Sequence, residues 1–210
     1  MQHIAVIDYG MGNLRSVSKA LETVSNGVAV EVTADPDRIL SASHIVFPGQ
    51  GAIRACLDEV QRLGLTDVIH HVAAEKPFLG ICIGMQLLMT HSDENGGVDG
   101  LNLFAGHVHH FDVDAAPHLK VPHMGWNQVH QTGTHPLWEN IEQDSRFYFV
   151  HSYYVDPDDD SITAATTEYP AKFTSVLYKD NIFAVQFHPE KSHNAGLQLL
   201  KNFVRWNGQQ

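Results

Sequence analysis

Two short stretches of the sequence contain residues that could attack an amide carbonyl. In "GICIG", residues 80–84, a cysteine stands between two glycines at the end of an apolar run. A G-x-C-x-G turn between a strand and a helix is the thiol counterpart of the nucleophile elbow, which lifts the reactive atom above the sheet. The free amides and dipole of a helix that begins at Cys82 favour a thiolate. The sequence therefore predicts a nucleophile at Cys82, and an ordinary buried core thiol is the competing interpretation.

The second stretch is "FHPE", residues 187–190, at the end of another apolar run. Side chains two positions apart in an extended segment project to the same face, and Pro189 favours an extended backbone at His188. A carboxylate beside an imidazole fixes its tautomer, and the imidazole can deprotonate a thiol and later protonate a leaving amine. We therefore predict His188 as general base and Glu190 as its orienting partner. The alternative is a pair of polar residues that face water at a strand end.

Attack on a carbonyl also needs hydrogen-bond donors for the oxyanion that develops. In "PGQG", residues 48–51, the glycines allow backbone amides to approach a substrate closely. We expect an amide near Gln50 and Gly51 to join the amide of Ile83, just after the nucleophile. Taken alone, P-G-x-G is only a turn signal.

Two other motifs have weaker functional interpretations. "DYGMGN", residues 8–13, resembles the start of a G-x-G-x-x-G dinucleotide fingerprint with Glu31 as its acidic residue, but Arg15 replaces the third glycine. "HVHH", residues 107–110, lacks the spacing and the cysteine partners of a metal site. We interpret the first as a structural turn and the second as surface histidines, and we expect no metal.

Strands and helices alternate through the first half of the chain, as in a mostly parallel sheet with helices on both faces. The strands are expected at residues 3–10, 28–33, 44–49 and 76–82, and the helices at 13–24, 52–65 and 84–94. The second half contains shorter β segments at residues 106–113, 146–155, 162–169, 173–180 and 182–190, and a final helix at 195–207. Ligands of such sheets bind beyond the carboxyl ends of the strands, which is where the motifs above lie.

Composition limits the class of protein. A chain of 210 residues with 43% hydrophobic and 18% charged residues is typical of one soluble domain, and no window approaches the length of a membrane span. The N-terminus shows no secretory signal, so we expect a cytoplasmic protein with two free thiols, Cys56 being a core residue. The net charge of −11 and the scattered basic residues argue against binding to nucleic acid or to a membrane.

Together, "GICIGMQ", "PGQGA" and "FHPE" resemble the motifs of class I glutamine amidotransferases, whose Cys-His-Glu triad hydrolyses the side-chain amide of L-glutamine. "IDYGMGNLRSV", "PHMGWN" and "FVHSY" resemble one branch of that family, the glutaminase subunits of histidine biosynthesis. The resemblance runs from the first strand to the last helix. It implies a flavodoxin-like three-layer fold in a single domain over residues 1–210, with no cofactor.

Site roles follow from the resemblance at matching positions. The triad is Cys82, which forms a γ-glutamyl thioester, with His188 and Glu190. The oxyanion hole is implied at Gln50, Gly51 and Ile83, and substrate binding at Gly49, Gln86, Glu94, Ser152 and Tyr153. Partner contact or gating is implied for Asn13, His123, Met124, Trp126, Asn127, Tyr148 and Lys191. The chain departs from the family at Gln50, where many members have valine.

The partner that the resemblance implies is a (β/α)8 barrel cyclase subunit in a heterodimer. It receives the ammonia and forms imidazole glycerol phosphate and an aminoimidazole carboxamide ribotide, and it keeps the glutaminase weak until its own ligand binds. Two alternatives remain open. One is a class I glutaminase of another pathway, such as pyridoxal phosphate synthesis. The other is a nucleotide- or metal-binding regulatory module in which the triad has no role.

Overall fold

The computed structural model describes residues 2–113 and 119–209, and its main feature is a 12-stranded mixed sheet. Five strands pair in parallel in the order β2-β1-β3-β4-β14, which confirms the parallel sheet expected from the first half of the chain. These strands are β1 (His3–Ile7), β2 (Ala29–Thr33), β3 (His44–Gly49), β4 (Phe78–Cys82) and β14 (Ile182–Val185). Because the strands run in the same direction, their carboxyl ends meet at one edge.

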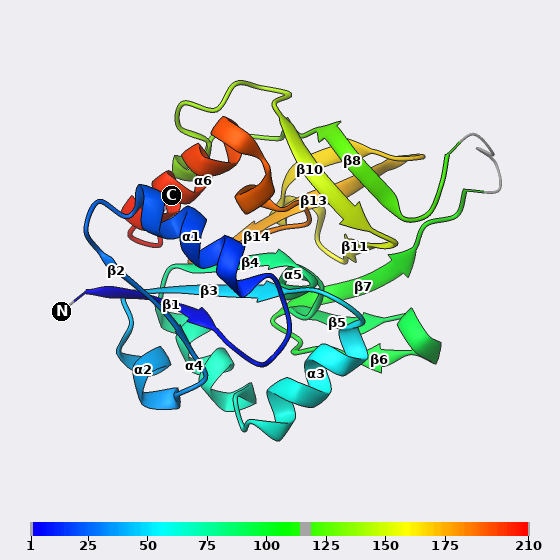
Figure 1. Ribbon diagram of the computed structural model, residues 1–210. Helices are drawn as coiled ribbons and strands as arrows, with labels where there is room; N and C mark the ends of the chain where they lie inside the picture. The colour runs from blue at the N-terminus through cyan, green and yellow to red at the C-terminus, as the bar shows by residue number, and fades with distance from the viewer. Residues whose placement is uncertain (1, 114–118, 210) are drawn as a thin grey trace.

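Helices cover both faces of this parallel part. Helices α1 (Leu14–Val24) and α6 (His193–Arg205) pack together on one face, and α2 (Pro36–Ser41), α3 (Ile53–Arg62) and α4 (Thr66–Glu75) lie on the other (Figure 1). Helices α1, α3 and α6 lie where the apolar periodicity predicts them, whereas α2 and α4 were not predicted. Within the described ranges, no helix has the length and apolar character needed to cross a bilayer.

Strands between residues 89 and 179 extend the sheet, mostly in antiparallel pairs. Beyond β14 the order continues through β13 (Lys172–Lys179), β11 (Tyr153–Pro157), β7 (Phe104–His110), β5 (Met89–Ser92) and β6 (Val98–Asp99), with β12 (Thr163–Glu168) on β13 and β9 (His130–Gln131) on β12. Short 3-10 helices are η1 (Glu94–Gly96), η2 (Pro136–Trp138), η3 (Asp160–Ile162) and η4 (Pro189–Lys191). The additional antiparallel strands expected in this half are therefore confirmed.

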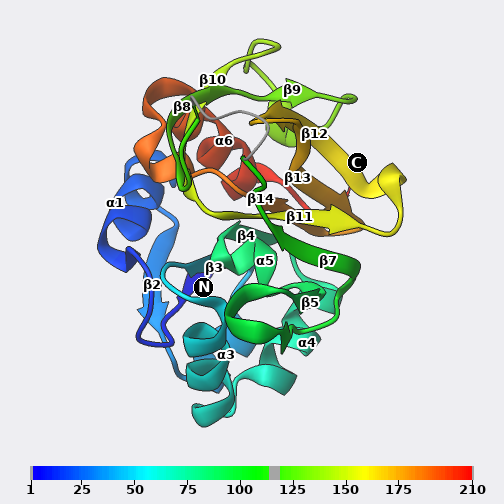
Figure 2. The ribbon, with the colours of Figure 1, turned by 90° about the vertical axis from the view of Figure 1, so that its right-hand side faces the viewer.

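A separate antiparallel pair is formed by β8 (His123–Gln128) and β10 (Arg146–His151). Figure 2 shows it in the upper part of the molecule, beside α6. The sequence predicts one strand over 146–155, but the chain breaks at Ser152, so β10 belongs to this pair and β11 to the large sheet. Strand β8 was not predicted.

The helix predicted over residues 84–94 is wrong for most of its length. Helix α5 (Ile83–Gln86) is a single turn, and the chain then enters β5. The reason is burial: Leu87, Leu88 and Met89 are all fully buried, and a continuous apolar run does not distinguish a strand from a helix. The start of the helix directly after Cys82 is confirmed.

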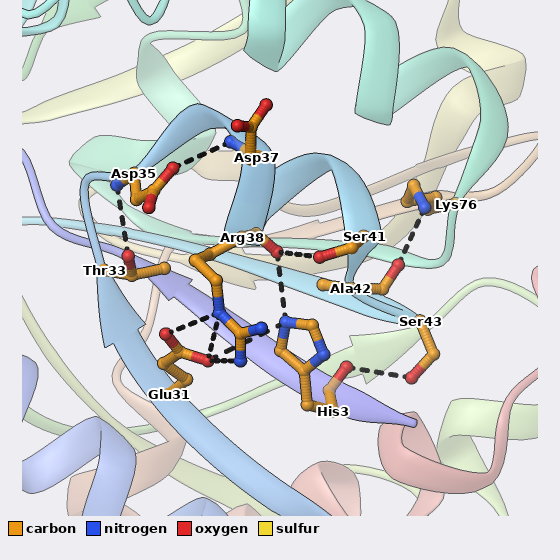
Figure 3. A network of polar contacts seen from close by, with 10 residues as sticks. All are labelled: His3, Glu31, Thr33, Asp35, Asp37, Arg38, Ser41, Ala42, Ser43 and Lys76. Carbon is orange, nitrogen blue, oxygen red and sulfur yellow. Dashed lines mark hydrogen bonds and ion pairs between the residues drawn. The ribbon is translucent and has the colours of Figure 1, made fainter. Parts of the chain in front are cut away.

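Figure 3 shows a polar network at the edge of the sheet, between β1, β2 and α2. Arg38 Nε donates to both carboxylate oxygens of Glu31, at 3.0 and 3.1 Å, and Asp35 caps α2 by accepting from the amide of Asp37 at 2.9 Å. Glu31 is therefore held in an ion pair instead of being free to bind a ribose. This pairing argues against the dinucleotide interpretation of residues 8–13.

Candidate active site

The nucleophile candidate, Cys82, lies at the junction of β4 and α5. Its φ of 55° places a non-glycine residue in the left-handed region, where a side chain is strained. In the parallel register Gly49 at the end of β3 is the partner of Cys82, so the expected oxyanion segment and the thiol end at the same level. The predicted elbow is thus present, with Cys82 only 4% exposed.

The glycines around the elbow allow a very close approach between backbones. A Cβ on Gly84 would lie 1.9 Å from the carbonyl oxygen of Phe47, and a Cβ on Gly49 would lie 2.7 Å from both Ile83 Cβ and the Tyr9 hydroxyl. No side chain fits at either position. The β3 end therefore packs directly against the turn that carries the thiol.

His188 and Glu190 form a buried pair. His188 Nδ1 donates to Glu190 Oε1 at 2.9 Å, and the two side chains are only 3% and 1% exposed. The expected pairing is present, although the path differs from the expected extended one because Glu190 lies in the 3-10 helix η4. The backbone of His188 is fixed as well: its N–H donates to Tyr148 O at 2.9 Å, and Ser192 Oγ donates to its carbonyl at 2.6 Å.

The charge state of His188 follows from its neighbours. Burial disfavours the imidazolium, but the Cys82 thiol and the Glu190 carboxylate outweigh burial and raise the pKa of His188 to about 10. Nε2 of His188 has no hydrogen-bond partner of standard geometry among the described residues, and Cys82 is the group that acts on it. Cys82 and Glu190 together therefore favour the charged form of His188.

A pH titration tests this arrangement. Because the folded pKa of His188 is raised, its imidazole is expected to stay protonated through neutral pH, and the stability that it contributes is complete below about pH 6.5 and lost as pH rises through about 10. The imidazole C–H resonances of His188, followed by NMR, should show no midpoint near neutrality. In Cys82→Ala the midpoint should move down, because the thiolate is gone. A midpoint near 6.5 in both proteins would contradict the pair.

These groups open into a cavity of about 340 Å³, a size typical of small-ligand sites. Its wall contains Cys82 and His188 together with most of the predicted oxyanion and substrate residues: Gln50, Gly51, Ile83, Gln86, Glu94, Ser152 and Tyr153. Gly49 is not part of the wall and lies behind it, against the elbow. Glu94 Oε2 accepts the amide of Ile53 at 2.9 Å, so this side chain also fixes the start of α3 beside the oxyanion segment.

One residue of the site was missed by the sequence analysis. Gln186 is fully buried, donates from Nε2 to Cys82 Sγ at 3.7 Å, and accepts from Gln86 Nε2 at 3.0 Å. Strand β14 ends at Val185 and Gln186 lies in the bend that follows, so the two-residue period of a strand does not relate its side chain to that of His188. The local signal that remains is a polar amide directly after the buried apolar run Ile182–Val185.

The predicted partner residues are only partly on the surface. Met124 and Trp126 are 62% and 40% exposed, while His123 is only 4% exposed. Trp126 stacks on His193 with 4.9 Å between ring centroids, and Lys191 lies 5.9 Å over the ring of Tyr148. We refer to Met124, Trp126, Tyr148, Lys191 and His193 as the aromatic patch.

The remaining predicted partner residues have internal roles. His123 Nδ1 pairs with His151 Nε2 at 2.9 Å, and Asn127 Nδ2 donates to Glu168 O at 3.0 Å. Asn13 stands at the N-terminus of α1 without a side-chain capping bond. His123 and Asn127 therefore connect strand β8 to neighbouring segments of the same chain. Direct contact with a partner fits only the exposed members of the predicted set.

Cys56 behaves as the core thiol predicted for it. It is fully buried on α3, its Sγ donates to Gln50 O at 3.6 Å, and burial raises its pKa to about 11. In the "HVHH" segment His109 Nδ1 lies 2.7 Å from Asp93 Oδ2, and the ring of His107 stacks on that of His109. Among residues 2–113 and 119–209 no group of three or more His, Cys, Asp or Glu side chains is arranged to hold a metal ion.

Removing the carboxylate from the pair has a defined expected effect. In Glu190→Gln the Oε1 acceptor at Nδ1 is preserved only if the amide orients correctly, and the negative charge that stabilises the imidazolium is lost. We expect turnover at this site to fall by about 10² to 10⁴-fold, less than on loss of the nucleophile. Glu168→Gln, on the surface of β12, is the matched control. Equal kcat values for the two variants would show that Glu190 has no role in the reaction.

The fold and this site define a class. The model of the class-I glutamine amidotransferase family matches residues 5–206, and the chain therefore belongs to the class I glutamine amidotransferases. Two similar relatives are each named imidazole glycerol phosphate synthase subunit HisH. The protein from Nitrosococcus oceani is 59% identical over 208 residues, with 99% of each chain covered, and that from Acinetobacter baylyi is 57% identical, with 99% of this chain and 100% of the relative covered.

Solved structures support the same fold. A putative GMP synthase protein from Thermoplasma acidophilum superposes with a TM-score of 0.73 at 21% identity, covering 98% of this chain and 93% of the other. PurLQS from Thermotoga maritima gives a TM-score of 0.70 at 17% identity, covering 98% and 99%. At these identities the likeness concerns architecture alone, and it agrees with the three-layer fold expected from the sequence.

Proposed function

We propose that this chain is the glutaminase subunit of imidazole glycerol phosphate synthase and supplies ammonia to a cyclase subunit in histidine biosynthesis. The observation that carries the chemistry is the buried His188–Glu190 pair, 2.9 Å between Nδ1 and Oε1, because His188 lines the same cavity as Cys82. Near-complete alignment with relatives of that name, at 53 to 59% identity, supports the pathway. We further propose that residues 1–210 act as a single domain and that the enzyme works in the cytoplasm.

The reaction follows from the groups in the cavity. The Cys82 thiolate attacks the side-chain amide carbon of glutamine, and backbone amides near Gly51 and Ile83 stabilise the oxyanion. His188 gives its proton to the nitrogen as the C–N bond breaks, which releases ammonia and leaves a γ-glutamyl thioester. His188 then takes a proton from water, whose oxygen attacks the thioester carbon; the C–S bond breaks, which releases glutamate and restores the Cys82 thiolate beside the protonated His188. Glu190 holds the imidazole in orientation throughout.

Substrate selection uses other polar residues of the cavity wall. Gln86 and Glu94 both line the cavity, and both carry acceptor oxygens for an ammonium group. The buried Oε1 of Gln86 has no hydrogen-bond partner among the described residues. A bound α-amino group supplies the missing donor, because a buried acceptor left unpaired is costly.

The partner surface that we propose is the aromatic patch. An exposed tryptophan next to an exposed methionine is typical of the centre of an interface, where aromatic residues are enriched. The patch lies close to the site, because Tyr148 O accepts the amide of His188 and Tyr148 is the register partner of Trp126. A docked cyclase subunit would therefore contact the strand pair that holds the catalytic histidine.

Trp126→Ala tests this surface. We expect the dissociation constant for the cyclase subunit, measured by calorimetry, to rise by about 10 to 100-fold, because a buried aromatic anchor contributes about 2 kcal/mol or more. Val32→Ala is the matched control, since Val32 is also 40% exposed but lies on the far edge strand β2. Equal affinities for the two variants would exclude the aromatic patch as the docking surface.

The experiment that tests the function is glutamate release from L-glutamine by the purified chain, first alone, then together with the cyclase subunit plus its ribonucleotide ligand. The expected result is strong stimulation by the loaded cyclase. Turnover that ignores the cyclase would keep the glutaminase chemistry and reject the pathway, and stimulation by a pyridoxal phosphate synthase barrel would assign the other pathway. Absence of glutamate in every mixture would reject the activity.

A further inference from the structure

A buried amide lies against the nucleophile. Gln186 is fully buried and is not part of the cavity wall. Its backbone N–H donates to Ser175 O at 2.9 Å, which continues the pairing of β13 with the end of β14. Gln186 itself lies in the bend that follows β14, and its Nε2 lies 3.7 Å from Cys82 Sγ.

The orientation of this amide is determined by the next residue in the network. Gln86 Nε2 lies within hydrogen-bond distance of two carbonyl oxygens, Tyr153 O at 3.1 Å and Gln186 Oε1 at 3.0 Å. Nitrogen must therefore be the donor at Gln86, and Gln186 must present its oxygen to it. The NH₂ group of Gln186 is left to donate to the sulfur. The opposite orientation would place two NH₂ groups together and a carbonyl oxygen against the sulfur.

We propose that Gln186 is a further catalytic residue, whose side-chain amide donates to Cys82 Sγ and links the nucleophile to Gln86 in the cavity wall. A hydrogen bond to the thiolate stabilises its charged form, and the effect is strong in a buried environment. Two groups then stabilise the anionic sulfur: the His188 imidazolium through its charge and the Gln186 amide through its N–H donor. Gln86 is the member of this relay that lines the cavity, and its buried Oε1 has no hydrogen-bond partner among the described residues.

The consequence is that occupancy of the cavity and reactivity of the thiol are connected through two amides. A donor bound to Gln86 Oε1 polarises the Gln86 amide, whose N–H then donates more strongly to Gln186 Oε1. Chains of hydrogen bonds strengthen one another in this way. The link to glutamine itself rests on the proposed function, whereas the hydrogen bond to Cys82 does not.

The test measures alkylation of Cys82 by iodoacetamide as a function of pH, with the modified peptide quantified by mass spectrometry. Gln186→Met keeps the length of the side chain and removes the donor. We expect the midpoint of the alkylation profile to move up by about one pH unit and kcat for glutamate release to fall by about tenfold, with KM little changed. An unchanged midpoint would overturn the hydrogen bond.

A matched control separates this role from damage to the fold. Asn202→Leu also removes a buried amide, one that donates to Leu137 O and Glu139 O from α6, away from the cavity. It should lower stability without moving the alkylation midpoint. If it moves the midpoint as far as Gln186→Met does, the shift reports general destabilisation and the proposal fails.

The relay is tested by a double-mutant cycle. Gln86→Met alone should raise the midpoint by a smaller amount, and it should add nothing once Gln186 is replaced, because the two amides act in series. Additive shifts would overturn the relay. Alkylation needs neither glutamine nor a partner protein, so a normal shift in a protein that fails to hydrolyse glutamine would reject the proposed function and keep this inference.

Discussion

Cys82→Ala is expected to release no measurable glutamate, a loss of at least about 10⁴-fold relative to the wild type. The thiol forms the covalent bond to the substrate, and the described residues of the cavity wall include no second thiol. Synthesis from added ammonium salts by the complex with the cyclase subunit should remain intact, because that route bypasses the thioester. Both activities are measured on the same preparation, by glutamate release and by product formation.

The second cysteine provides an internal control for this prediction. Cys56 has its pKa raised to about 11 by burial, so its thiol stays protonated near neutral pH. A glutamine analogue that alkylates thiols should therefore label the wild-type chain once, at Cys82, and should not label Cys82→Ala. Loss of ammonia-dependent synthesis together with glutaminase activity would instead assign Cys82 to the fold or to the subunit interface.

Gly84→Ala is expected to lower the free energy of unfolding by about 3 kcal/mol or more. The added Cβ would lie 1.9 Å from the carbonyl oxygen of Phe47 and 2.9 Å from its carbonyl carbon. Both are backbone atoms in the centre of the sheet, so relief requires β3 and α5 to separate. Urea unfolding measures the loss. The same displacement opens the distance between Gly49 and the thiol, so glutamate release should fall even where the variant is folded.

The matched control is Gly133→Ala, where a Cβ would meet nothing within 4 Å. An alanine there should leave stability unchanged or raise it slightly, by about 0.4 to 1 kcal/mol, through the unfolded chain. If Gly84→Ala unfolds at the same urea concentration as Gly133→Ala, the close approach at the elbow contributes nothing to stability. The presence of glycine at position 84 would then need a reason other than the close approach to Phe47.

Much of this site could be predicted because its chemistry lies in short local signals. The glycines around Cys82 and the proline between His188 and Glu190 constrain the backbone directly, and the structure places all three side chains at one edge of the sheet. The alternation of strands and helices predicted the parallel half for the same reason, since each apolar period reflects the face that an element buries.

The parts that could not be predicted depend on tertiary packing. The one-turn α5 and the strand β5 replace a predicted helix because burial on all sides overrides the local preference of a run such as Leu87–Met89. Gln186 acts through two contacts at sequence separations of 100 and 104 residues, which no local pattern contains. His123 matches a surface position by motif but is buried by the ring of Tyr169, 4.0 Å away between centroids.

The parallel register between Gly49 and Cys82 restricts how the length of this chain can vary. Inserting or deleting one residue within Phe78–Ile81 turns every later side chain of β4 to the opposite face of the sheet. Such a change would move the thiol away from both His188 and the oxyanion segment, even though the apolar composition of the strand is unaltered. Insertions and deletions accepted in this chain should therefore fall in distant turns such as Asp158–Asp160, and the interval between the two glycine motifs should tolerate them only outside β3 and β4.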